Sequence, residues 1–236
     1  MINPLILVTL FPLVGVVIIA FLKDDAKAAI RWAALATSLV TFGISLWLLA
    51  IFNPADPNLQ YAFNLPWSAS ASPADGSDLN FGFSMGVDGI SLLMVLLTTL
   101  LTPISILSAW ESVQDRVKGF MLFFLLLEVG MIGVFLATDL VLFFIFWEFT
   151  LVPMYFLIGI WGGERRVYAA IKFFIFTMSG SVLMLLAILY MGLTAGTFYL
   201  PDLIANRAAF AGAGLWLVLA FAAAFAIKVP MWPFHT

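Results

Sequence analysis

The sequence predicts an all-α, polytopic transmembrane helix bundle of about seven spans, with a proline-broken last helix. Of its 236 residues, 64% are hydrophobic and 10% are charged, whereas an average soluble domain is about 25% charged. The mean hydropathy is +1.14. So few charges cannot cover the surface of a water-soluble chain of this length, and we therefore expect the protein to lie in a lipid bilayer.

Seven stretches are apolar enough to cross a bilayer, which takes roughly 20 residues of helix. They cover residues 4–22, 33–52, 87–109, 120–137, 140–161, 170–193 and 215–231. Each should be helical, because lipid offers no partner for backbone N–H and C=O groups. The seventh contains Pro230 and Pro233 and has no polar exit loop, so we expect a broken helix in a chain that is one part of a longer protein.

The loops between the spans divide into two sets by charge. The loops after spans one, three and five hold seven basic residues, and the opposite loops hold only Arg207. The seven are Lys23, Lys27, Arg31, Arg116, Lys118, Arg165 and Arg166. Because basic loops stay on the cytoplasmic side, we expect the N-terminus outside and, as the location, a bacterial plasma membrane.

The longest loop, at about residues 53–86, is then external, and its composition favours short strands or turns. We expect residues 1–112 to form spans one to three with this loop, and residues 113–236 to form a second unit. Asp88 begins span three, and Asp139 directly precedes span five. A short acidic side chain in that position is typical of a helix N-cap.

Composition also excludes several classes of site. The chain has no cysteine, which rules out disulfides, thiolate zinc and iron–sulfur ligation within it. Its one histidine, His235, rules out a bis-histidine haem. The net charge of −3 without a basic run gives no indication of nucleic-acid binding, and no phosphate-binding or dinucleotide-binding motif is present.

Glu148 is the first of three ionisable residues expected deep in the bilayer. It lies eight residues into span five, roughly 12 Å from its start. A carboxyl in an apolar environment can bind and release a proton near neutral pH, because burial disfavours its charged form. Pro153 should free a backbone carbonyl at Phe149 and open the helix to water. The alternative is a structural glutamate hydrogen-bonded to a neighbouring helix.

Lys228 lies roughly 20 Å into span seven, next to Pro230. Discontinuous helices often form ion sites in transporters, so Lys228 is a candidate for proton exchange. The alternative is a lysine that extends its ammonium to the membrane surface.

Three further residues are weaker candidates for a proton relay. Glu128 in span four should lie at a depth similar to Glu148, since spans four and five are joined by a two-residue turn. Lys172 begins span six, where extension to the membrane surface is the ordinary behaviour. His235 either relays protons within the broken span or is simply an exposed residue.

Several segments resemble the M-type (chain 4) antiporter-like subunits of respiratory complex I. They are GVDGISLLMVLLTTLLTP at 86–103, GVFLATDLVLFF at 133–144, FFIFWEFTLVPMYFLIGIWGG followed by ERRVYAAIKFFIFTMSGS at 143–181, and AFAIKVPMWPFHT at 224–236. Together they cover most of the chain beyond span two.

The resemblance implies about 14 spans with two inverted five-helix repeats, each with a broken helix and a proton half-channel. Residues 113–236 would form the first repeat, incomplete at its C-terminus. In that family Glu148 would pair with Lys228, with Glu128 and His235 at further family positions. NADH, FMN, iron–sulfur clusters and quinone would be bound by partner subunits, with none in this chain. The partners would be the L-type and N-type membrane-arm neighbours, the lipid bilayer and protons.

The sequence is compatible with three functions. The first is a proton-translocating, non-redox subunit of NADH:quinone oxidoreductase. The second is a subunit of an Mrp-type sodium/proton antiporter or of a membrane-bound hydrogenase, which share the same glutamate and lysine features. The third is an inactive, truncated membrane scaffold that only packs against partners.

Overall fold

A computed structural model describes residues 3–67 and 81–235. Six helical segments are long and apolar enough to cross a membrane: α1 (Pro4–Phe21), α2 (Lys27–Ile51), α3 (Gly89–Ser112), α4 (Val117–Leu136), α5 with α6 (Leu140–Trp161) and α7 (Arg166–Ala195). The predicted transmembrane bundle is confirmed. A shorter apolar helix, α9 (Gly214–Lys228), stands where the seventh span was predicted. Its 15 residues rise roughly 22 Å, less than the hydrocarbon thickness of about 30 Å.

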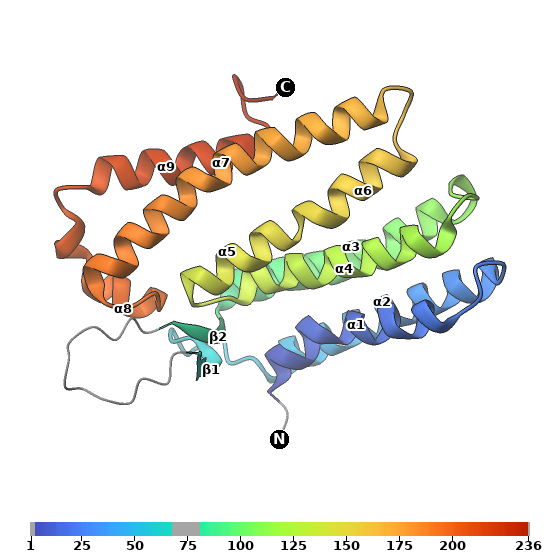
Figure 1. Cartoon of the computed structure of the whole chain (residues 1–236). Coiled ribbons are helices and arrows are strands. Elements are labelled where there is room, and N and C mark those ends of the chain that lie inside the picture. The colour runs from blue at the N-terminus through green and yellow to red at the C-terminus, as the bar shows by residue number, and fades with distance from the viewer. Residues whose placement is uncertain (1–2, 68–80, 236) are drawn as a thin grey trace.

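The helices lie side by side in layers (Figure 1). Helix α4 is the central element, since it contacts α1, α2, α3, α5 and α6. Helices α7 and α9 pack against each other at the opposite edge from α1 and α2. The loops joining α1 to α2, α3 to α4 and α6 to α7 gather at one end of the bundle, as their shared charge predicted.

Two strands lie at the other end of the bundle (Figure 1). Strand β1 (Gln60–Pro66) pairs antiparallel with β2 (Gly82–Val87). Short strands were expected in the loop at 53–86, and they flank the part of it, residues 68–80, that lies outside the described residues. Residues 137–139 add to β2 through a bridge between Met85 and Ala137. A second bridge joins Asp139 to Tyr199, just before the short helix α8 (Leu200–Ala205), which the sequence analysis did not predict.

Both predicted N-caps are confirmed. Asp88 accepts a hydrogen bond from the Ser91 N–H at 2.7 Å, and the Ser91 hydroxyl accepts one from the Asp88 N–H. Asp139 accepts from the N–H groups of Val141 and Leu142 at 2.8 and 3.1 Å. The other carboxylate oxygen of Asp139 accepts from the Gly82 N–H, so one side chain begins α5 and attaches it to β2. Burial raises the pKa of Asp139, and these donors oppose that effect.

Span five is interrupted next to Pro153, where the sequence predicts that the helix opens. Helix α5 ends at Phe149 and α6 begins at Leu151, with Thr150 as the turn between them. Pro153 lies in the first turn of α6 and supplies no N–H to Phe149, which accounts for a break at this point. Helix α7 begins at Arg166, four residues before the predicted start of the span at residue 170.

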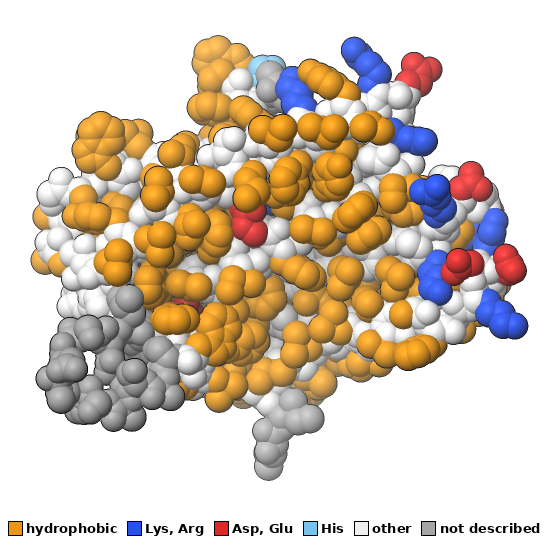
Figure 2. Space-filling view, viewed as in Figure 1, with side chains coloured by type: hydrophobic (Ala, Val, Ile, Leu, Met, Phe, Trp, Pro, Cys, Tyr) orange, Lys and Arg blue, Asp and Glu red, His pale blue; other side chains and the backbone are white. Residues whose placement is uncertain are grey.

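The sides of the bundle are apolar, and the charged side chains gather at the end that carries the three basic loops (Figure 2). Several of these cations bind backbone carbonyls of a neighbouring loop. Lys27 donates to the Gln114 carbonyl and Arg31 to the Val113 carbonyl. Lys118 donates to the Leu22 carbonyl and pairs with Asp24 at 3.1 Å. The basic residues therefore also hold the α1–α2 and α3–α4 loops together.

We predict that Asp139→Ala lowers the free energy of unfolding by about 1–2 kcal/mol, the usual cost of losing an N-cap. Asp139→Asn keeps an acceptor oxygen and should cost much less. Thermal unfolding in detergent, followed by helical circular dichroism, measures both. The control is Asp25→Ala, since Asp25 is exposed. An Asp139→Ala protein as stable as this control would contradict the assignment.

Candidate functional site

Lys228 is the last residue of α9, and its ammonium turns towards the break in span five. It donates a hydrogen bond of 3.1 Å to the Thr150 hydroxyl. It also lies 4.8 Å from the centre of the Trp147 ring, within the range of a cation–π interaction. Both contacts lie within the bundle, so the ammonium is held against α5 and does not extend to the membrane surface.

Glu148 lies between the two residues that Lys228 contacts. It is half-buried and close enough to Lys228 for a Coulombic attraction. Among the described residues no ion pair joins the two side chains within 4.0 Å. The structure therefore brings Lys228 of α9 to the turn of α5 that carries Glu148, with the Thr150 hydroxyl and the Trp147 ring as the direct contacts of the ammonium.

Thr150 and Trp147 were not recognised in the sequence, although both organise this turn. The Thr150 hydroxyl donates to the Trp147 carbonyl at 2.8 Å while it accepts from Lys228. The indole N–H of Trp147 donates to the Ser181 hydroxyl of α7 at 3.1 Å. The turn is thus connected by hydrogen bonds to both α7 and α9. The only local signal for Thr150 was its place three residues before Pro153.

Helix α4 approaches the same turn very closely at Gly130. A Cβ added to Gly130 would lie 2.8 Å from the Thr150 methyl group, so no larger residue fits without displacement. One turn further along, a Cβ on Gly133 would meet the Phe146 ring. These two glycines allow the backbone of α4 to lie directly against α5 and the Thr150 turn.

Glu128 is also on α4 but faces another way. At about 100° per residue, it lies about 200° around the helix from Gly130, which contacts the Thr150 turn. The residue beside its carboxyl is Thr102 of α3. Glu128 is fully buried, and neither carboxyl oxygen has a hydrogen-bond partner among the described residues. The carboxyl of Glu128 therefore lies on a different side of α4 from the Thr150 turn, which is next to Glu148.

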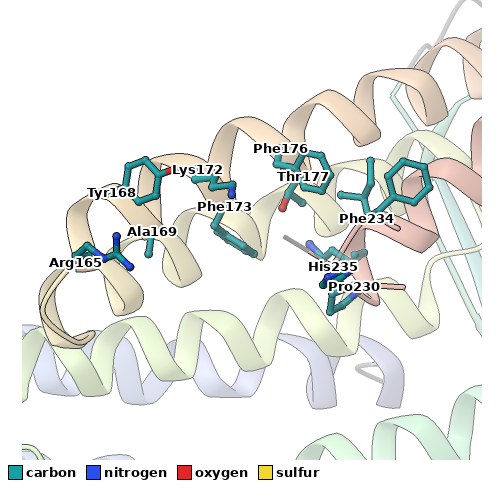
Figure 3. A pocket seen from close by; sticks show the side chains of 12 residues that line it. Arg165, Tyr168, Ala169, Lys172, Phe173, Phe176, Thr177, Pro230, Phe234 and His235 are labelled. Carbon is teal, nitrogen blue, oxygen red and sulfur yellow. The ribbon is translucent and has the colours of Figure 1, made fainter. Parts of the chain in front are cut away.

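A cavity of about 440 Å³ opens beside Lys228. Lys172 and His235, two of the predicted relay candidates, also line it. Figure 3 shows Lys172 on α7 and His235 with Pro230 on the segment after α9, on two sides of the same space. His235 is exposed. The structure thus gathers Lys228, Lys172 and His235 around one cavity, with Glu148 nearby and Glu128 separate.

Within residues 3–67 and 81–235, no group of three or more histidine, cysteine, aspartate or glutamate side chains could hold a metal ion. The groups that do come together are two amines, an imidazole, a carboxyl and a hydroxyl. These can bind and exchange protons, and they lie next to a cavity large enough for several water molecules.

The chain is similar to known membrane proteins over almost all of its length. Residues 137–236 match a family described as "NADH:quinone oxidoreductase/Mrp antiporter, TM". The chain is 44% identical to NADH-quinone oxidoreductase subunit M of Rhodobacter capsulatus, covering 99% of this chain and 47% of that protein. It is 42% identical to NADH-ubiquinone oxidoreductase chain 4 of Prototheca wickerhamii, covering 97% and 45%.

A solved structure agrees with these matches. In respiratory complex I from Thermus thermophilus with bound NADH, one chain superposes with a TM-score of 0.76 at 31% identity, covering 98% of this chain and 45% of that one. The chain therefore spans about half the length of the relatives that it matches.

We predict that Gly130→Ala destabilises the protein by about 1–3 kcal/mol, the usual cost of overpacking, because the new methyl group would displace Thr150. Gly43→Ala is the matched control, since nothing lies within 4 Å of a Cβ added there. It should be neutral or slightly stabilising, as alanine is the better helix former. Thermal unfolding of both variants in the same detergent provides the comparison, and equal behaviour would disprove the close contact.

Proposed function

Because the chain belongs to the NADH:quinone oxidoreductase/Mrp antiporter transmembrane family, in its subunit M (chain 4) branch, we propose that it translocates protons as a membrane-arm subunit of NADH:quinone oxidoreductase. The observation that carries the proposal is the position of Lys228: an ammonium inside an apolar bundle, bound to Thr150, beside Glu148 and open to a cavity. Residues 113–236 would act as one antiporter-like repeat.

In the proposed mechanism the charge of Lys228 depends on Glu148. An ammonium in an apolar interior is costly unless a nearby negative charge or hydrogen-bond acceptor compensates it. While Glu148 is ionised and close, Lys228 keeps its proton and holds the Thr150 hydroxyl. When Glu148 is protonated or moves away, that compensation is lost, and Lys228 releases its proton towards the cavity lined by Lys172 and His235.

Glu128 has a different position in this proposal. It is directed towards Thr102 on α3 and has no described partner, so it does not exchange protons directly with Lys228. We propose that it is held as a neutral carboxylic acid, since an unpaired buried charge would be strongly unfavourable.

Electron transfer would take place elsewhere in the complex. We propose that partner subunits hold the NADH site, FMN, the iron–sulfur clusters and the quinone, and that this chain has no redox site. Its neighbours would be the L-type and N-type subunits in a bacterial plasma membrane. The names of the curated relatives support complex I over the Mrp or hydrogenase alternative. The proton-exchanging groups around Lys228 favour transport over an inactive scaffold.

We predict that Glu148→Gln, made in the assembled complex, lowers NADH-driven proton pumping by about tenfold or more, as expected for loss of a proton-transfer group. Quenching of a ΔpH-sensitive dye in inverted membrane vesicles measures pumping, and NADH oxidation is followed in parallel. Glu111→Gln is the control, because Glu111 is exposed at the end of α3. Pumping and quinone reduction that both stay intact in Glu148→Gln would refute the proposal. Sodium-driven transport without NADH oxidation would favour the Mrp alternative.

The proposed orientation has its own test. The chain has no cysteine, so a single introduced cysteine is unique within it. We predict that a membrane-impermeant maleimide added to intact cells labels Asn58→Cys, which is exposed near β1, and does not label Glu164→Cys, which is exposed in the α6–α7 loop. Inverted vesicles should give the opposite pattern. Labelling of Glu164→Cys alone in intact cells would reverse the orientation.

A further inference from the structure

A second, larger cavity lies at the charged end of the bundle, away from Lys228. Its volume is about 680 Å³, and it lies between the α3–α4 loop on one side and the end of α6 and the start of α7 on the other. Arg116 and Arg166 line it from the two sides. Neither residue takes any part in the proposed proton path, so this cavity requires a separate explanation.

The two arginines differ from the basic residues of the neighbouring loops. Lys27, Arg31 and Lys118 are all bound to backbone carbonyls. Arg116 and Arg166 are exposed, and the guanidinium group of neither makes a hydrogen bond or ion pair with any of residues 3–67 and 81–235. Their guanidinium groups therefore have donors free for a ligand. The opposing charge in the cavity lining is Asp115, so the lining keeps a net positive charge.

The wall of the cavity is held in place by Trp161. Its indole N–H donates to the Asp115 carbonyl at 2.9 Å, and its ring packs edge-on against Phe120 at 5.3 Å. These contacts fix the α3–α4 loop to the end of α6. The backbone of Arg116 has a φ of 51°. This is the left-handed region, which residues other than glycine rarely adopt. The arginine is thus positioned by a defined, closely packed loop.

The surroundings of the cavity indicate an amphipathic ligand. Val167 lines it and is 60% exposed, and exposed Phe156 and Val152 continue along α6 into the apolar side of the bundle. Tryptophan at the end of a span marks the interface between headgroups and hydrocarbon. A ligand here would have its anionic end between two arginines and its apolar part along α6.

We propose that this cavity binds the phosphate of an anionic phospholipid, with Arg116 and Arg166 as its donors and the acyl chains against α6. Arginine suits this role because its planar guanidinium donates two parallel hydrogen bonds to phosphate oxygens. Basic pockets between helices on the cytoplasmic side are typical sites for anionic headgroups. A bound lipid would link the α3–α4 loop to the first turn of α7. This inference goes beyond proton transport and does not depend on it.

The test uses the whole complex in nanodiscs of phosphatidylcholine that contain a photoreactive phosphatidylglycerol. After illumination, mass spectrometry locates labelled peptides of this chain. We expect labelling at residues 112–118 and 159–167, and a decrease of about tenfold in Arg116→Gln/Arg166→Gln, since each cation contributes to attraction of anionic lipid. Arg207→Gln, at the opposite end, is the control and should leave the labelling unchanged.

Two further arms keep the result decisive if the double variant does not assemble. Arg116→Lys/Arg166→Lys preserves the charge and should retain part of the labelling. A photoreactive phosphatidylcholine should label these peptides weakly in the unaltered complex. Equal labelling by both lipids would overturn the proposal. Displacement of phosphatidylglycerol by inorganic phosphate alone would show that the cavity binds free anions, and would overturn the assignment to lipid.

Discussion

The close approach of α4 to the break in span five is the contact on which the candidate site depends. Only glycine at position 130 lets the α4 backbone reach the Thr150 methyl group. With its methyl group against α4, Thr150 presents its hydroxyl to α5 and α9, where it binds the Trp147 carbonyl and the Lys228 ammonium. A small residue on one helix thus determines where a cation can be held on another, 98 positions later in the chain.

Lipid offers no hydrogen-bond partners, so the polar groups of this bundle must bind one another. They do so in two ways. Most buried hydroxyls donate to a carbonyl of the preceding turn, as Thr41 does to Thr37 and Thr102 to Thr98. The groups around Lys228 in addition bind side chains of other helices, since Lys228 donates to Thr150 and Trp147 donates to Ser181. A bond of this second kind would change when helices move relative to one another, whereas a bond within one helix would not.

Much of the fold could be predicted from the sequence, because span length and hydropathy are properties of continuous segments. The N-caps Asp88 and Asp139 were equally local, since each lies directly before the helix that it begins. The contact between Lys228 and Thr150 could not be predicted, because it joins residues 78 positions apart and depends on the rotation of two helices. The same holds for Glu128: its depth followed from counting residues, whereas its direction towards α3 became clear only from the packing of Gly130.

The extended residues 137–139 have a mechanical consequence for α5. They are hydrogen-bonded to β2 on one side, through the Thr138 N–H and the Ser84 carbonyl, and to the segment before α8 on the other, through the Leu200 N–H and the Thr138 carbonyl. Helix α5 is therefore anchored at its first residue and cannot slide along its axis without pulling on both. Any movement of α5 relative to its neighbours would then be a tilt about that anchor. The displacement then grows with distance from Leu140, and Thr150, roughly 15 Å along the helix, lies where a small tilt has its largest effect on α5.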